Sequence, residues 1–304
     1  MREIRIPAFA KVNLWLDILG KRPDGYHELR TIFQTISLHD ELTLRDSKAS
    51  GICLNIQGNE SLSLEPVRKN LVYAAVDTLR RELKIRSGVE IDLRKKIPAG
   101  RGLGGGSSDA AAALRGYLRL TRRDIPEPRL MEIAASLGAD VPFFLFGGRA
   151  LGIGRGDEIY PLPDVPRLTL LVVSPKDIHV PTPDAYRWLK APALTKAHSA
   201  SKLWKFCSLC WSLPAVAGAQ GSGLSNDFER PVFQRHPQLA QIKRALLQRG
   251  ATEASLAGSG SAVFGVFPSP ALARRAAVGF QDEQTFVCET VSRDRYLRRV
   301  QSAP

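Results

Sequence analysis

The feature that most constrains this fold is a cluster of five glycines between a predicted strand and a predicted helix. They lie in residues 98–108, which read PAGRGLGGGSS. Residues 89–93 before the cluster alternate apolar and polar side chains as a half-buried strand does, and residues 110–118 after it are rich in helix formers. Glycines at such a junction let backbone N–H groups approach an anion, and a helix N-terminus favours negative charge. We therefore expect a phosphate-binding loop at residues 102–108.

Other nucleotide-binding loops fit this cluster less well. Residues 100–105 satisfy the letters G-x-G-x-x-G, but the segment about 20 residues later is charged and interrupted by prolines, where a dinucleotide site needs a second strand ending in an acidic residue. The only Gly-Lys pair, at residues 20–21, is followed by Arg22, and the protein-kinase motifs His-Arg-Asp and Asp-Phe-Gly are absent. The simpler alternative is a glycine-rich turn without a ligand, although five glycines carry an entropic cost that a plain turn does not need.

The charge of the chain indicates anionic partners. The 304 residues carry a formal net charge of +13, which suits nucleic acid or membrane phosphate but also a small polyphosphate drawn into a cleft. The sequence has no apolar stretch of about 20 residues, and its first residues lack the apolar core of a secretory signal, so we expect a cytoplasmic protein with no membrane partner. The length allows two lobes, which we place at residues 1–160 and 161–304.

The cysteines give little support for a metal site. Cys207 and Cys210 have the spacing of half a zinc site, but no second pair accompanies them. They lie in an apolar and aromatic segment, residues 203–211, which favours packed core or a helix face.

The start of the chain predicts a strand at residues 8–18 with two polar side chains on one face. Lys11 and Asn13 are two residues apart, so they point the same way. A turn at residues 22–25 then places Tyr26 and His27 directly after it. Further strands are expected at residues 29–36, 41–44 and 52–57, followed by a helix at residues 71–81.

A second set of elements surrounds Asp140. A helix is predicted at residues 131–137, with Gly138 as its C-cap, and Pro142 prevents the helix from continuing. The sequence then predicts a hairpin broken by glycines at residues 147–156 and an apolar strand at residues 168–173. Residues 193–223 accumulate Ala, Ser and Gly and give no assignment. The glycine-rich residues 256–267 precede a strand and are interpreted either as a hairpin turn or as a loop that leans on the first glycine cluster.

Three separated motifs resemble those of the GHMP small-molecule kinases. They are Lys11-x-Asn13, residues 102–108 and residues 258–261. Residues 23–27, 70–73, 104–111, 138–144 and 226–229 resemble more closely the branch of that family that phosphorylates a cytidylated sugar alcohol. The resemblance implies an α+β, two-lobed GHMP kinase fold. Its N-terminal lobe would be like the second domain of ribosomal protein S5, and its C-terminal lobe would be a ferredoxin-like α/β sandwich.

The resemblance also implies an activity. A kinase of this branch uses ATP and Mg²⁺ to phosphorylate a hydroxyl on the methylerythritol part of a cytidine-diphosphate substrate, a step of non-mevalonate isoprenoid synthesis. The partners would then be these small molecules and not nucleic acid, and the enzyme would be a monomer or a weak homodimer.

Site roles follow from the resemblance position by position. Asp140 matches the catalytic aspartate and Lys11 the catalytic lysine, and this pairing suits phosphoryl transfer, because a carboxylate accepts the hydroxyl proton while an ammonium counters phosphate charge. No metal ligand is identified. Five residues are matched to substrate binding. Tyr26 and Tyr186 would be the rings on either side of cytosine, and His27 would contact the cytosine edge. Asn13 and Thr182 complete the set. Those matched to ATP binding are Asn70, Lys95, Pro98, Ala99, Gly100, Arg101, Gly102, Leu103, Gly104, Gly105, Gly106, Ser107 and Ser108.

Two positions depart from the family pattern. Arg101 stands where a small residue is common and is interpreted either as a phosphate contact or as solvent-facing, and Ala257 stands where Ser or Thr is frequent. Two other functions stay open. A GHMP kinase for homoserine or mevalonate would not need Tyr26, His27 and Tyr186. A basic RNA-binding protein would explain the charge but not residues 104–108 or Asp140.

Overall fold

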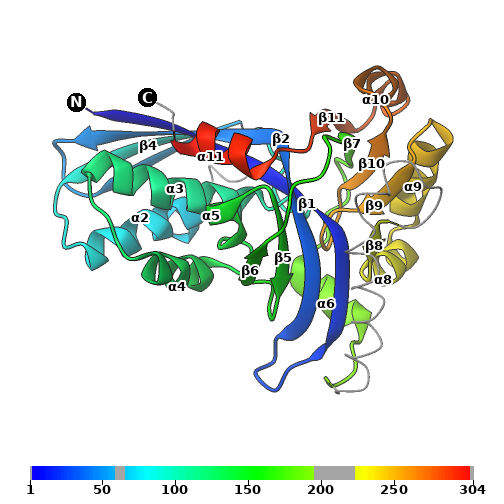
Figure 1. The fold of residues 1–304 in the computed structure, drawn as a ribbon, viewed down its shortest axis with the longest axis horizontal. Helices are drawn as coiled ribbons and strands as arrows, with labels where there is room; N and C mark the ends of the chain where they lie inside the picture. The colour runs from blue at the N-terminus through cyan, green and yellow to red at the C-terminus, as the bar shows by residue number, and fades with distance from the viewer. Residues whose placement is uncertain (1, 59–65, 195–222, 302–304) are drawn as a thin grey trace.

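The computed structural model describes residues 2–58, 66–194 and 223–301, and its strands form two sheets (Figure 1). Helices pack on both sheets, as expected for an α+β fold. Residues 193–223, which had no assignment from the sequence and which include Cys207 and Cys210, lie almost entirely outside the described residues. No helix within those described ranges is long and apolar enough to cross a bilayer.

The first sheet is built around a long antiparallel hairpin of two strands that run side by side (Figure 1). Its order is β3-β4-β2-β1-β8, with β5 pairing β2 and β6 pairing β5. The register of β1 against β2 shifts at three places, and such bulges bend a strand. The strands are β1 (Glu3–Lys21), β2 (His27–Ser47), β3 (Ile52–Gln57), β4 (Gly88–Arg94), β5 (Arg149–Ile153), β6 (Glu158–Pro161) and β8 (Ser225–Asn226).

The prediction of two separate strands at residues 29–36 and 41–44 was wrong, because β2 is continuous. Residues 37–40 are polar or interrupt the alternation of the apolar side chains. They stay extended because β2 bulges here, where the register against β1 shifts between Phe9 and Lys11, and because Asp40 is buried and accepts a hydrogen bond from the backbone N–H of Ile97 at 2.8 Å. A tertiary contact therefore decides the backbone here.

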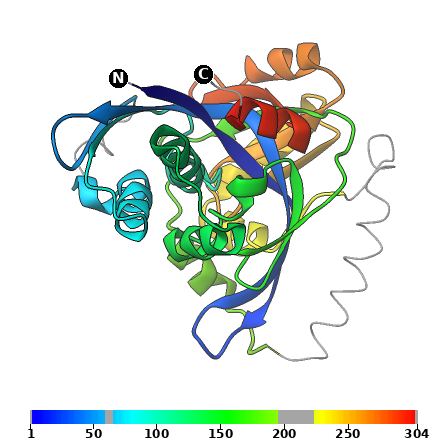
Figure 2. The ribbon, with the colours of Figure 1, turned by 60° about the vertical axis from the view of Figure 1, so that its left-hand side comes forward.

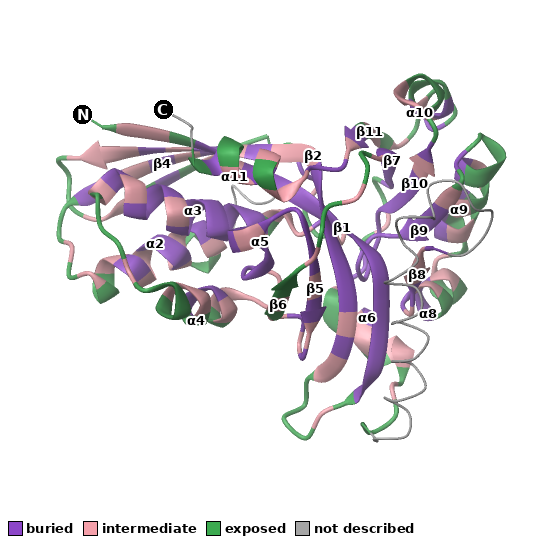
Figure 3. Cartoon of the chain, viewed as in Figure 1, coloured by how far each residue is buried: buried purple, intermediate pink, exposed green. Residues whose placement is uncertain are grey.

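Helices cover one side of the first sheet, where α2, α3 and α4 lie together (Figure 2). In α2 the side chain of Asn70 accepts a hydrogen bond from the Val72 N–H and caps the helix. The small residues 110–113 of α3 are all buried, so α3 packs closely on β1 and β2 (Figure 3). The helices are α2 (Leu71–Glu82), α3 (Gly105–Thr121), α4 (Glu127–Leu137) and α5 (Phe143–Phe146), with the 3-10 helix η1 (Val67–Lys69).

The second sheet is antiparallel, with the order β11-β7-β10-β9. Every residue of β7 is buried, which confirms the predicted apolar strand at residues 168–173. Helices α9 and α10 pack on this sheet. The strands of this sheet are β7 (Thr169–Ser174), β9 (Glu253–Leu256), β10 (Val263–Phe267) and β11 (Gln284–Glu289). The helices in this part of the sequence are α6 (Thr182–Leu189), α8 (Glu229–Arg235), α9 (Pro237–Gln248), α10 (Pro270–Ala277) and α11 (Arg293–Gln301).

The two sheets share an apolar core. Val12 and Leu14 of β1 are buried in one cluster with Leu170 and Phe264 of the second sheet. The lobe boundary near residue 160 stays a prediction. After residue 160 the chain returns to the first sheet twice, because β8 pairs with β1 and α11 packs in the core of the first sheet.

Candidate active site

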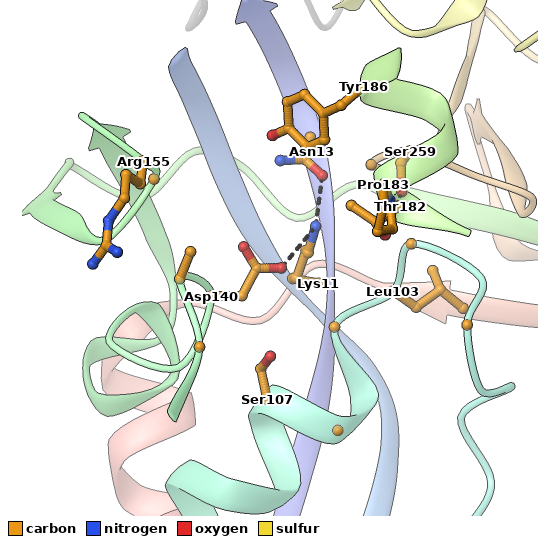
Figure 4. Close-up of a pocket in the computed structure, with 18 of the residues that line it drawn as sticks. Lys11, Asn13, Leu103, Ser107, Asp140, Arg155, Thr182, Pro183, Tyr186 and Ser259 are labelled. Atoms are coloured by element: carbon orange, nitrogen blue, oxygen red, sulfur yellow. Dashed lines mark hydrogen bonds and ion pairs between the residues drawn. The ribbon is translucent and has the colours of Figure 1, made fainter. Parts of the chain in front are cut away.

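A cleft of about 1640 Å³ opens where loops from both halves of the chain meet. Figure 4 shows side chains from β1, from the loop before α5 and from α6 that surround it. Every site residue predicted from the sequence except Ser108 lines this cleft, and Ser108 lies buried in the first turn of α3. The structure therefore brings together residues that are up to 175 positions apart in sequence.

The first glycine cluster joins β4 to α3, as predicted, but the helix begins earlier than expected. It starts at Gly105 and not at Ala110, so residues 105–108 form its first turn. No side chain caps this N-terminus, which leaves the first N–H groups free for an anion. Gly104 has φ +72°, and a Cβ there would lie 2.8 Å from the Phe144 ring and 3.0 Å from Cγ of Lys11. Glycine is thus needed both for the turn and for the close approach of Lys11.

The second glycine run leans on the first, which was one of the two interpretations of residues 256–267. The Ala262 N–H donates to the Arg101 carbonyl at 3.2 Å. A Cβ on Gly102 would lie 1.8 Å from the carbonyl oxygen of Ala257, so the two loops touch through backbone. This contact leaves little space at Ala257, which is fully buried.

Arg101 has a contact that the sequence did not indicate. Its guanidinium donates to the Ser261 hydroxyl and to the Lys176 carbonyl, both at 2.9 Å. Since these partners belong to the second half of the chain, Arg101 fastens the two glycine loops together. These two partners are distant in sequence, so no local pattern indicated them. Arg101 also lines the cleft, and its interpretation as a phosphate contact stays a prediction.

Lys11 lies beside Asp140 in a fixed position. Its Nζ is 3.3 Å from Oδ2 of Asp140 and donates to Oδ1 of Asn13 at 2.8 Å, as the predicted shared face requires (Figure 4). The Asn13 amide donates in turn to the Thr31 hydroxyl at 2.7 Å. The backbone N–H of Lys11 donates to the carbonyl of Leu103 at 3.0 Å, which ties the lysine to the glycine loop. The Lys11 side chain is 5% exposed and that of Asp140 is 32% exposed, so the carboxylate is the member of the pair that a ligand can reach.

Aromatic side chains gather at the end of the cleft formed by the β1–β2 turn and α6. The rings of His27 and Tyr186 stack with centroids 4.6 Å apart, and Tyr186 packs edge-on against Phe228. Burial and the charge of Lys21 lower the pKa of His27, while burial and then the charge of Asp140 raise the pKa of Tyr186. Tyr26 is more than half exposed at the cleft rim. The facing pair in this structure is His27 with Tyr186, and the sandwich of a base between Tyr26 and Tyr186 stays a prediction.

Thr182 and Asn70 both line the cleft. Thr182, the first residue of α6, forms a hydrogen bond with the Ser259 hydroxyl at 3.0 Å, which links α6 to the second glycine loop. Asn70 caps α2, and its role in ATP binding stays a prediction.

Lys95 lines the cleft and forms ion pairs with two buried carboxylates. Its Nζ contacts Asp40 and lies 2.6 Å from Oδ2 of Asp109, and all three side chains are buried. Burial raises the pKa of Asp109 to about 8. Burial also opposes the charge of Lys95, but Asp109 and Asp40 outweigh it and raise the pKa of the lysine. Sequence reasoning missed both carboxylates, because no local pattern connects positions 40, 95 and 109.

The motif at residues 226–229 holds the second glycine loop. The Asn226 amide donates to the carbonyls of Leu256 and Gly258, both at 2.8 Å. Glu229 accepts from the Leu256 N–H at 3.0 Å, and Asp227 accepts from the Ile18 N–H at 2.8 Å. The sequence marked this motif only by resemblance, and the structure shows that it joins β1 to the loop.

Comparisons with known proteins agree with this arrangement. Residues 70–148 match the family described as GHMP kinases N terminal domain, and residues 213–283 match GHMP kinases C terminal. A 4-diphosphocytidyl-2-C-methyl-D-erythritol kinase from Solibacter usitatus is 45% identical over 298 residues, which are 97% of this chain and 91% of that protein. The chain belongs to the 4-diphosphocytidyl-2-C-methyl-D-erythritol kinase family. The predicted resemblance to the cytidylated-alcohol branch is thereby confirmed.

Solved structures agree with membership of this kinase family. A crystal structure of 4-(cytidine 5'-diphospho)-2C-methyl-D-erythritol kinase matches with a TM-score of 0.77 at 33% identity, covering 94% of this chain and 99% of that one. A homoserine kinase from Cytophaga hutchinsonii matches with a TM-score of 0.75 at 22% identity, covering 96% and 95%, and supports the fold alone. The predicted two-lobed GHMP fold and the class of ATP-dependent small-molecule kinase are confirmed.

Proposed function

We propose that this kinase transfers the γ-phosphate of ATP to the methylerythritol hydroxyl of 4-diphosphocytidyl-2-C-methyl-D-erythritol and gives the 2-phosphate. The observation that carries the proposal is the order of groups in one cleft, where the Lys11–Asp140 pair is flanked by the glycine loop and by the aromatic cluster. The names of the relatives support this substrate. The reaction would serve non-mevalonate isoprenoid synthesis in the cytoplasm, where ATP is supplied.

In this proposal Asp140 accepts the proton of the attacking hydroxyl. Phosphoryl transfer asks a protein chiefly to position the reactants and to stabilise charge, with a base or orienting group at the nucleophile. The Asp140 carboxylate is the partly exposed member of its ion pair. Lys11, buried and fixed by Asn13, would counter the charge of the transferred group.

The ATP phosphates would lie over the N-terminus of α3. Its first-turn N–H groups and the glycines with positive φ form a cradle that side chains would fill. The described residues include no group of three or more His, Cys, Asp or Glu able to hold a metal ion. Because Mg²⁺ is usually bound largely through substrate phosphates, we propose that it enters with ATP and neutralises the charge of the phosphates.

The cytosine would bind among Tyr26, His27, Tyr186 and Thr182. Aromatic faces suit stacking on a pyrimidine. The lowered pKa of His27 favours the neutral ring, in which one nitrogen donates and the other accepts a hydrogen bond. A cytosine edge offers both kinds of partner, so a neutral histidine is suited to it.

ADP release with three acceptors tests the proposal. The purified enzyme, ATP and Mg²⁺ are combined with the cytidylated alcohol, homoserine or mevalonate. We expect turnover only with the cytidylated alcohol. Turnover with homoserine or mevalonate would show a kinase with a different substrate. No turnover with any of the three acceptors would rule out the proposed function.

A further inference from the structure

Arg155 lies on the ring of Tyr26. The guanidinium carbon is 5.0 Å from the ring centroid, which is the geometry of a cation–π contact. The two residues come from separate turns, since Tyr26 is in the turn between β1 and β2 and Arg155 is in the turn between β5 and β6. Both residues line the cleft. No sequence motif pointed to Arg155.

Arg155 is itself held in place from behind. Its Nε donates to Oδ2 of Asp157 at 3.0 Å. The turn that carries it is anchored to β2, because the Leu29 N–H donates to the Gly154 carbonyl at 2.8 Å. Tyr26 is held mainly through its backbone, since its N–H donates to Asp24 at 3.1 Å and its carbonyl accepts from the Arg22 N–H at 2.8 Å, while the residue is more than half exposed.

We propose that Arg155 is a positioning residue that holds the Tyr26 ring, so that the free face of the ring is presented to the pyrimidine of the substrate. This inference rests on the proposed function. An exposed ring on a turn would otherwise lose rotamer freedom when the base binds, and that loss would weaken binding. A guanidinium already stacked on one face removes part of this cost before the substrate arrives.

The test separates a role through Tyr26 from a direct phosphate contact. We would prepare Arg155→Met, Arg155→Lys, Tyr26→Ala and the double variant Tyr26→Ala/Arg155→Met. For each we would measure kcat, KM for both substrates, and inhibition by cytidine and by CDP. Arg155→Met should raise KM for the cytidylated alcohol and the inhibition constant of cytidine by about two- to five-fold, as a cation–π contact at an exposed site implies. The KM for ATP and kcat should not change, and Arg155→Lys should restore part of the affinity.

The double variant decides the mechanism. If Arg155 acts through Tyr26, the Met substitution should have no further effect on cytidine inhibition once Tyr26 is alanine. Arg187→Met is the matched control, because Arg187 lines the same cleft but pairs with Asp184 of its own helix α6. It removes the same charge and should leave cytidine inhibition unchanged.

Three results would overturn the inference. They are additive effects of the two substitutions, weaker inhibition by CDP with unchanged inhibition by cytidine, and an equal effect of Arg187→Met. The second result would make Arg155 a phosphate contact. In each case wild-type turnover of the cytidylated alcohol would stand, whereas a wild type that neither turns it over nor is inhibited by cytidine and CDP would remove the proposed function as well.

Discussion

At the scale of single residues, the position of Lys11 depends on contacts from three parts of the chain. Its backbone meets Leu103 in the glycine loop, and its side chain meets Asn13 on its own strand and Asp140 before α5. An ammonium with so little freedom can act on one small region of the cleft. The proposed chemistry therefore takes place beside Asp140.

Replacing Asp140 by asparagine tests this assignment. The change keeps the shape of the side chain and removes the base, so kcat should fall by roughly 10²–10⁴-fold. ATP binding should be nearly intact, because the phosphate cradle is formed by other residues. The measurements are steady-state turnover and titration with a non-hydrolysable ATP analogue.

A second carboxylate in the cleft provides the control for that substitution. Glu132 lines the cleft but pairs with Arg129 on the surface of α4. Glu132→Gln should leave kcat within about two-fold of the wild type, as surface substitutions generally do. Unchanged turnover in Asp140→Asn would remove Asp140 from the mechanism.

At the scale of elements, regular patterns were predicted well and tertiary contacts were not. The strand predicted at residues 52–57 matches β3, and the helix predicted at residues 71–81 differs from α2 only by one residue at its end. Both were predictable because alternation and helical periodicity are local patterns. The continuity of β2 and the role of Arg101 depend on partners far away in the sequence, so no local pattern could show them. The same holds for Asp40 and Asp109 behind Lys95.

The candidate site shows the same division. Motifs located Lys11, Asp140 and the glycine loop, and the structure places them in one cleft. They did not locate Arg155, since an arginine in a glycine-broken turn has no signature of its own.

The second glycine loop depends on Asn226, which gives a prediction for this element. Asn226→Ala would leave the buried carbonyls of Leu256 and Gly258 without these donors, at a cost of about 1–3 kcal/mol in unfolding free energy for each. Since Gly258 approaches Lys11, kcat should fall as well. Urea denaturation and steady-state kinetics measure the two effects.

Asn55→Ala is the control for Asn226. Asn55 donates to Asp92 on an exposed face of the first sheet, so its loss should change unfolding free energy by no more than about 0.5 kcal/mol. If Asn226→Ala were as stable and as active as Asn55→Ala, the loop would have to be held by Glu229 without Asn226.

At the scale of the whole molecule, the buried Asp40–Lys95–Asp109 cluster should make stability depend on pH. Asp109 has a pKa of about 8 in the folded protein, against an ordinary value of 3.8. Between these values the folded state binds more protons than the unfolded state, so the unfolding free energy falls as pH rises from about 4 to about 8. Lys95 stays charged throughout this window because its pKa is raised.

Asp109→Asn removes the titrating carboxyl and should flatten that decline. Urea denaturation of both proteins at pH 6, 7, 8 and 9 measures the difference in slope. The comparison uses slopes because the substitution also changes absolute stability. Parallel profiles for the two proteins would show that another group governs the pH dependence.

β1 pairs with β2 over most of its length, pairs with β8 near Trp15, and contributes Val12 and Leu14 to the core shared with the second sheet. Mechanically, β1 is a rigid strand fixed in both lobes, and the Lys11 ammonium lies near its middle. A strand fixed in both lobes resists the hinge closure that two-lobed enzymes with a flexible linker use. Access to the cleft should then be controlled at its rim, by small movements of the turns that carry Tyr26 and Arg155, while the distance between the two glycine loops stays constant through the catalytic cycle.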